Sequence, residues 1–125
     1  RQQSESLPQR AYSGYYDFDE KQWLGMRYTL EKLRTESTGK ELLIITFPVV
    51  ADFARSKQEA TVPPLRTLLK DASTDLGFTY FDLMEDISKT EHFDDLHLPE
   101  DPHWTEYGAE VVAQLLLDKW SFYTR

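Results

Sequence analysis

Hydrophobic residues recur at helical spacing in three stretches of the chain, which two short apolar runs separate. In the first stretch one face carries Trp23, Met26, Leu30 and Leu33, which predicts a helix with a core-facing side. Asp17 or Asp19 is suited to cap its start, and we expect it to end at about Ser37. Residues 1–13 are polar and aperiodic, so we expect a linker or lead-in over residues 1–18.

The other two helices are marked by local signals at their ends. Pro63 and Pro64 suit the first turn of a helix, and Gly77 suits its left-handed end. The apolar face between them consists of Leu65, Leu68, Leu69, Ala72 and Leu76. Thr105 is suited to cap a last helix that reaches about Trp120.

Two short runs of apolar and β-branched residues predict strands. They span residues 42–47 (LLIITF, ended by Pro48) and 78–82 (FTYFD). Residues 49–61 fit either a loop or a short helix near Phe53. Helices alternating with strands predict an α/β fold with right-handed crossovers. A parallel strand as apolar as residues 42–47 needs partners on both edges, so we expect further strands from upstream residues, another chain or unrecognised segments.

Composition narrows the classes of function. The 125 residues include 14 Lys and Arg against 22 Asp and Glu, a net charge of −8. That balance disfavours sequence-independent binding of nucleic acid and docking on an anionic membrane. The lack of cysteine excludes disulfides, thiolate metal ligands and cysteine nucleophiles. No apolar run is long enough to span a bilayer, so we expect no membrane insertion.

The most informative segment is residues 98–109 (LPEDPHWTEYGA), just ahead of the last helix. Asp101 stands two residues before His103, so its carboxylate can accept a hydrogen bond from Nδ1 of the imidazole. Such a bond fixes the tautomer and leaves Nε2 as a general base. Pro102 restricts the backbone between them. The loop follows the second strand, on the side where open α/β sheets bind ligands.

The DPHW block at residues 101–104, followed by Thr105 and Gly108, resembles the last conserved block of SGNH (GDSL-like) hydrolases. The runs ELLIITFPV and FTYFDL are similar to late strands of that fold. The resemblance covers roughly residues 20–120. It implies that residues 19–125 are the C-terminal half of a three-layer αβα, flavodoxin-like SGNH domain. It also implies a serine esterase or O-acyltransferase without a cofactor, in which His103 and Asp101 are catalytic.

Other functional blocks of that family are missing. Its nucleophile lies in a Gly-Asp-Ser block after the first strand, and its oxyanion donors are a Gly and an Asn of later blocks; none of the three occurs here. Ser13 follows no strand, so we do not expect it to be the nucleophile. The resemblance therefore implies a serine upstream of Arg1, and we expect this chain alone to be inactive.

The implied substrate is an ester or an acylated carbohydrate, and the implied compartment is a bacterial envelope or periplasm. Trp104, Pro48 and Val49 are candidates for the wall of the substrate pocket, with packing as the simpler role for each. Exposed strand edges also predict a homodimer, or association with a missing N-terminal part.

Other interpretations stay open. A degenerate SGNH-like module that binds a glycan or a protein also fits the missing serine. Histidines and aspartates within residues 92–103 suit zinc or manganese, but their spacing matches no helix-face ligand pattern, so we expect no metal. Four aromatic residues near the first helix are a weaker candidate for a carbohydrate platform: Tyr15, Tyr16, Phe18 and Trp23.

Overall fold

The structure is a computed structural model that describes residues 11–87, 96 and 103–123 of the chain. The described part is a mixed α/β fold that is mainly helical. In chain order its elements are α1 (Glu20–Glu36), β1 (Leu43–Thr46), α2 (Val50–Glu59), α3 (Pro64–Leu76), β2 (Thr79–Asp82), α4 (Leu83–Ile87) and α5 (Glu106–Tyr123).

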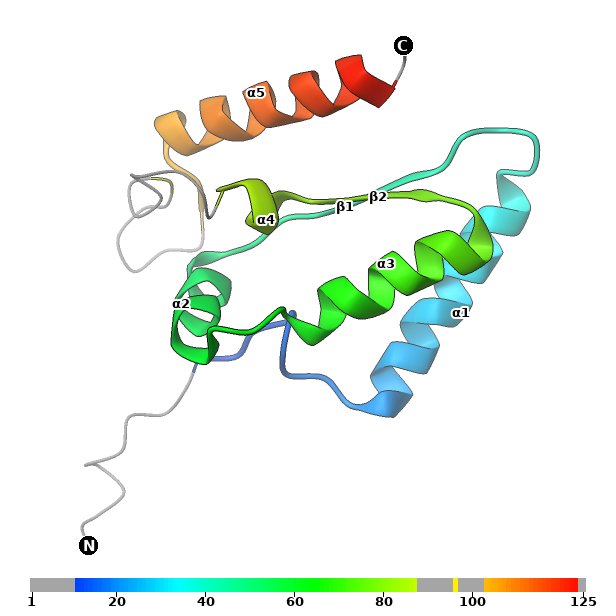
Figure 1. The fold of residues 1–125 in the computed structure, drawn as a ribbon, viewed down its shortest axis with the longest axis horizontal. Coiled ribbons are helices and arrows are strands. Elements are labelled where there is room, and N and C mark those ends of the chain that lie inside the picture. The colour runs from blue at the N-terminus through cyan, green and yellow to red at the C-terminus, as the bar shows by residue number, and fades with distance from the viewer. Residues whose placement is uncertain (1–10, 88–95, 97–102, 124–125) are drawn as a thin grey trace, which may run out of the picture.

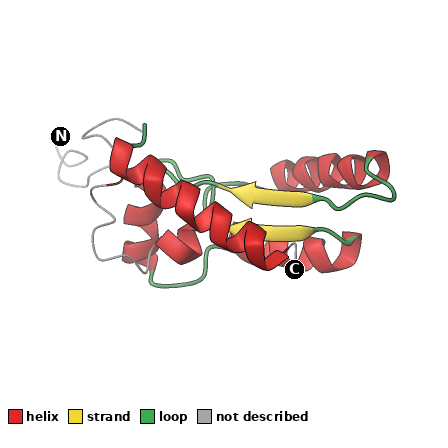
Figure 2. Ribbon diagram, turned by 90° about the horizontal axis from the view of Figure 1, so that it is seen from above, coloured by secondary structure: helices red, strands yellow, loops and turns green. Residues whose placement is uncertain are grey.

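The two strands pair in parallel, with Leu43 opposite Thr79 and Thr46 opposite Asp82. Within the described residues they form a two-stranded sheet. Figure 1 shows α1 and α3 below this sheet and α5 above it, and Figure 2 shows α5 crossing over the strands. Both strands end on the side of the molecule where α2 and α4 follow them and where α5 begins. The predicted α/β class is therefore confirmed.

Local signals fixed the ends of three helices. Asp19 caps α1: its Oδ1 accepts a hydrogen bond from Gln22 N at 2.7 Å, and Gln22 Oε1 accepts one from Asp19 N at 2.9 Å. Gly77 ends α3 at φ 79°, a left-handed conformation that favours glycine. Thr105 caps α5, since its Oγ1 accepts a hydrogen bond from Gly108 N at 2.9 Å.

The interior consists of two apolar clusters, one toward α4 and α5 and one toward α1 and α3. The first is built from Tyr15, Phe53, Leu83, Met84, Ile87 and Leu96. The second is built from Leu30, Leu69, Ala72 and Phe78. Because the strands lie between helices, Ile45 packs against the first cluster and Ile44 against the second.

The structure corrects the predicted core face of α1. Leu30 is buried, but Met26 is 47% exposed and Leu33 is 43% exposed. The physical reason is that α1 packs along one side, against α3 and the neighbouring strand, and no second described layer covers its remaining apolar side chains. Helical spacing shows which residues share a face, but it does not show how much of that face a neighbour covers.

Two helices lie where the sequence pattern was ambiguous or silent. Residues 50–59 form the ten-residue helix α2, and residues 83–87 form α4 directly after β2. Ser13 and Tyr15 are buried although they fall within the predicted lead-in of residues 1–18. The predicted boundary between residues 18 and 19 therefore does not separate packed from unpacked residues. Among the described residues, no helix is both long and apolar enough to cross a membrane.

Candidate functional site

The predicted base, His103, is exposed and lies just before the first turn of α5. This helix begins on the side of the sheet where both parallel strands end (Figure 1). Ligands of open α/β sheets bind outside the carboxyl ends of the strands, and His103 lies on that side of the sheet, while its catalytic role stays a prediction. Asp101 lies outside the described residues, and the hydrogen bond between the two side chains stays a prediction.

The segment that carries His103 is fixed by its contacts with Leu96. Leu96 is fully buried, and its carbonyl oxygen accepts a hydrogen bond from Thr105 N at 2.8 Å. Gly108, in the first turn of α5, lies against the same carbonyl. A Cβ atom at position 108 would stand 2.1 Å from Leu96 O. The backbone next to the exposed imidazole is therefore held in place by its hydrogen bond to the buried Leu96 and by the capped start of α5.

Replacing Gly108 with Ala should destabilise the protein by about 1–3 kcal/mol, because the added methyl group must displace backbone rather than a flexible side chain. Gly25→Ala is a matched control: Gly25 lies inside α1 with nothing within 4 Å of its Cβ position. That change should stabilise the protein by up to about 1 kcal/mol. Urea unfolding midpoints measure both effects. Equal effects of the two substitutions would show that the close contact with Leu96 does not exclude a side chain at position 108.

The three candidates for the pocket wall have different surroundings. Trp104 is half-buried and packs against the cluster that contains Leu96. Pro48 is fully buried. Val49 is 37% exposed, and its backbone N–H donates to Asp52 Oδ2 at 2.7 Å at the start of α2. Trp104 and Pro48 thus have packing roles, and contact of any of the three with a substrate stays a prediction.

The metal interpretation depends largely on side chains that lie outside the described residues: His92, Asp94, Asp95, His97 and Asp101. Among the residues that are described, no group of three or more His, Cys, Asp or Glu side chains could hold a metal ion.

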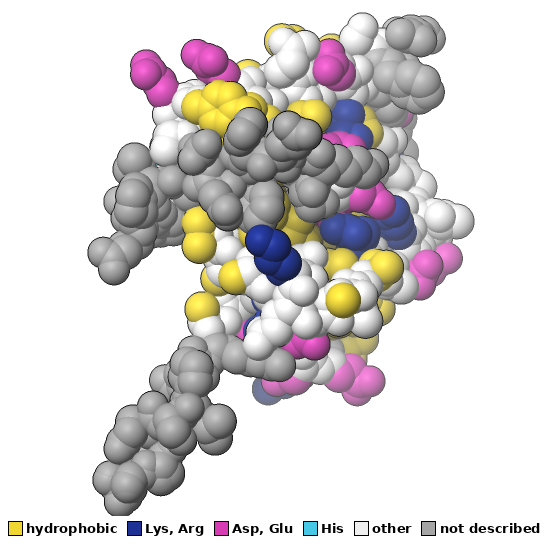
Figure 3. Space-filling view, turned by 60° about the vertical axis from the view of Figure 1, so that its left-hand side comes forward, with side chains coloured by type: hydrophobic (Ala, Val, Ile, Leu, Met, Phe, Trp, Pro, Cys, Tyr) yellow, Lys and Arg dark blue, Asp and Glu magenta, His cyan; other side chains and the backbone are white. Residues whose placement is uncertain are grey.

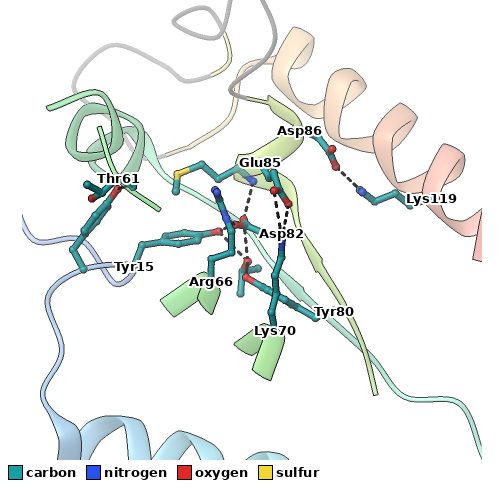
Figure 4. A network of polar contacts seen from close by, with 12 residues as sticks. Tyr15, Thr61, Arg66, Lys70, Tyr80, Asp82, Glu85, Asp86 and Lys119 are labelled. Carbon is teal, nitrogen blue, oxygen red and sulfur yellow. Dashed lines mark hydrogen bonds and ion pairs between the residues drawn. The ribbon is translucent and has the colours of Figure 1, made fainter. Parts of the chain in front are cut away.

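A buried carboxylate stands at the end of β2. Asp82 accepts hydrogen bonds from Tyr15 OH at 2.9 Å, from Met84 N at 3.0 Å and from Thr46 Oγ1 at 3.3 Å. It also forms an ion pair with Arg66 Nε. Figure 4 shows Tyr15 and Arg66 converging on this carboxylate from different segments. The network ties β1, β2, α3 and the segment before α1 together at the carboxyl end of the sheet.

This polar network keeps its two tyrosines neutral. Burial raises the pKa of Tyr15, and the charge of Asp82 raises it further. Burial also raises the pKa of Tyr80, whose hydroxyl lies 2.8 Å from Thr46 Oγ1. Burial by itself would lower the pKa of Arg66, but the hydrogen bond with Asp82 and the charges of Asp82 and Glu85 together outweigh burial, so the pKa is raised. Both phenols therefore serve as hydrogen-bonding groups and not as bases.

Ser13 is part of a second buried network. Its hydroxyl donates to Asp52 Oδ1 at 2.6 Å and accepts from Tyr15 N at 3.2 Å, and the side chain is fully buried. Asp17 nearby accepts from Arg55 Nη1 at 2.8 Å. These bonds satisfy buried polar groups in a turn, which is a structural role for Ser13. A buried hydroxyl that donates to a carboxylate lacks the exposure that attack on a substrate needs.

A cavity of about 380 Å³ lies between the start of α1, residues 12–18 and the end of β1. Its aromatic lining residues are Tyr12, Tyr15, Phe18, Trp23 and Phe47. Three of the four aromatic residues considered from the sequence are thus brought together. The Tyr16 ring instead lies under the Arg55 guanidinium, whose Cζ atom is 5.1 Å from the centroid of the tyrosine ring. His103, Trp104, Pro48 and Val49 do not line this cavity.

Sequence reasoning missed Tyr12, Phe47 and Asp52 as lining residues. Phe47 carried a usable signal, because an aromatic residue that ends a parallel strand stands at the edge where ligands bind. Asp52 carried none, since its place in the wall depends on Ser13, which is 39 positions away in the chain.

Comparisons with protein-family models, with curated proteins and with solved structures returned no significant match.

Proposed function

We propose that this chain is the part of an SGNH-type serine esterase or O-acyltransferase domain that carries the general base His103 and its orienting partner Asp101. The nucleophilic serine belongs to residues upstream of Arg1. The observation that carries the proposal is the exposed imidazole at the start of α5, on the side where both parallel strands end. The substrate class is an ester or an acylated carbohydrate.

The chemistry follows from the order of proton transfers. The serine hydroxyl attacks the carbonyl carbon of the ester while His103 Nε2 takes its proton. The tetrahedral intermediate collapses, and the same proton passes to the departing alcohol. Water or a sugar hydroxyl then attacks the acyl-serine while His103 takes its proton, and the bond between the acyl carbon and serine Oγ breaks as the imidazolium returns that proton to the serine. Asp101 accepts a hydrogen bond from Nδ1 and stabilises the imidazolium that forms in each half.

A complete three-layer αβα, flavodoxin-like domain belongs to the same proposal. Helices on both faces of the sheet support it, as does the outer edge of β1, which has no partner strand among the described residues. Leu117 and Trp120 of α5 are more than half exposed and line a groove with Leu43 and Ile45 of β1 and Phe81 of β2. Additional parallel strands would be buried in this groove.

A serine-directed fluorophosphonate probe tests the proposal. We expect covalent labelling of one serine in the longer protein that includes the upstream residues, and no labelling of the 125-residue chain alone. Heat-denatured longer protein is the control, because labelling should need the folded site. If the longer protein resists the probe under conditions that label a known serine hydrolase, the domain is a non-catalytic binding module instead.

A further inference from the structure

The aromatic cavity beside β1 is lined by both exposed and buried side chains. Tyr12 is 67% exposed and Phe47 is 50% exposed, whereas Tyr15 is buried. The Tyr15 ring lines the cavity and extends from the N-terminal segment toward Asp82 of the polar network (Figure 4). A small molecule can therefore enter beside the exposed Tyr12 and Phe47 side chains and contact Tyr15, which is held by its hydrogen bond to Asp82.

The charge of the lining has one sign. Among the described residues that line the cavity, Asp52 is the sole carboxylate, and none is Lys, Arg or His. Its side chain is held by hydrogen bonds from Ser13 Oγ and Val49 N, and no ion pair found among the described residues includes it. The two donors and the N-terminal end of α2 stabilise the carboxylate without neutralising it by a cation.

Aromatic side chains next to a buried, hydrogen-bonded carboxylate that has no ion pair among the described residues favour one class of ligand. The ring quadrupole attracts a cation above its face, most strongly where water is excluded, and the carboxylate adds a direct charge attraction. An anionic ligand would meet repulsion from Asp52 and find no cationic partner. A neutral ligand would gain apolar contact with the rings but no charge term.

We propose that this cavity binds an organic ammonium group, such as a trimethylammonium head. Its volume of about 380 Å³ falls in the range of small-molecule pockets. The net charge of −8 also raises the local concentration of cations around the protein. The cavity does not include His103, so ammonium binding is independent of the proposed acyl transfer.

Choline and its neutral carbon isostere, 3,3-dimethyl-1-butanol, separate charge from shape. Titration calorimetry on the 125-residue chain should give a Kd of about 1 mM or lower for choline, and a Kd at least about tenfold higher for the isostere. Equal affinities would overturn the proposal, because apolar contact alone would then account for binding. Tighter binding of methyl β-glucoside than of choline would overturn it in favour of a sugar site.

Two lining residues and one outside residue test the location. Phe47→Ala and Asp52→Asn should each weaken choline binding about tenfold, since each removes one source of attraction for the cation. Tyr28→Ala is the matched control: Tyr28 is a 61% exposed aromatic residue on α1 that does not line the cavity. If Asp52→Asn unfolds the chain, Phe47→Ala still decides, because it removes a half-exposed ring. Unchanged affinity in Phe47→Ala would overturn the proposal.

Discussion

Asp82→Ala is expected to lower the free energy of unfolding by about 3–5 kcal/mol, the usual effect of removing one partner of a buried ion pair. The Asp82 side chain is fully buried and that of Arg66 is 12% exposed. Without the Asp82 carboxylate, the largely buried Arg66 guanidinium is left charged and without this ion-pair partner. Tyr15 OH and Met84 N also lose an acceptor, and buried donors without partners are costly.

Glu85→Ala is the control for this substitution. Glu85 lies three residues further along and pairs with Lys70 at 3.4 Å, but both side chains are about half exposed. Because solvent screens such a pair, its loss should change stability by less than about 1 kcal/mol. Guanidinium unfolding of both variants gives the comparison. Equal losses would show that the buried carboxylate does not hold the carboxyl end of the sheet together.

A double-mutant cycle measures how much of the effect of Asp82→Ala comes from its ion pair with Arg66. Arg66→Ala combined with Asp82→Ala should destabilise by less than the sum of the single changes, since the first loss already leaves the other group unpaired. Asp82→Asn should recover part of the loss, because the amide oxygen can still accept from Met84 N. Additive effects of Arg66→Ala and Asp82→Ala would mean that this ion pair contributes little and that the hydrogen bonds to Tyr15 and Met84 dominate.

What the sequence predicted well depends on interactions within a few residues. Asp19, Gly77 and Thr105 mark helix ends through bonds that span four positions or fewer. The two strands were recognisable because short β-branched runs are buried between helices in α/β folds. The position of His103 before α5 followed from the same local signals.

What the sequence did not predict depends on contacts between distant segments. Tyr15 belongs to the core through its hydrogen bonds with Thr46 and Asp82, which lie 31 and 67 positions away. No periodic pattern marks such a residue. α2 was ambiguous because Val49 offers no capping side chain. Its start is fixed instead by Asp52, whose carboxylate accepts the Val49 N–H from within the helix.

His103→Ala in the longer protein is expected to lower kcat/KM for an activated ester by roughly 10²–10⁴-fold, the contribution of a positioned general base. The fold should survive, because His103 is exposed and does not belong to either buried apolar cluster. Tyr107→Phe is the matched control in the first turn of α5, where the ring is 43% exposed. It should leave turnover unchanged. Unfolding midpoints measured alongside separate a lost base from a lost fold.

Asp101→Asn decides whether the carboxylate acts through the imidazole. Alone it should also reduce turnover, because the amide no longer fixes the tautomer that leaves Nε2 as the base. In a protein that already carries His103→Ala, Asp101→Asn should reduce turnover almost no further, since residues that act as one unit have non-additive effects on rate. If instead the two effects multiply, Asp101 contributes by itself, by binding substrate or by holding the loop. Full activity in His103→Ala would remove the imidazole from the mechanism, and with it the reason to regard the start of α5 as a catalytic site.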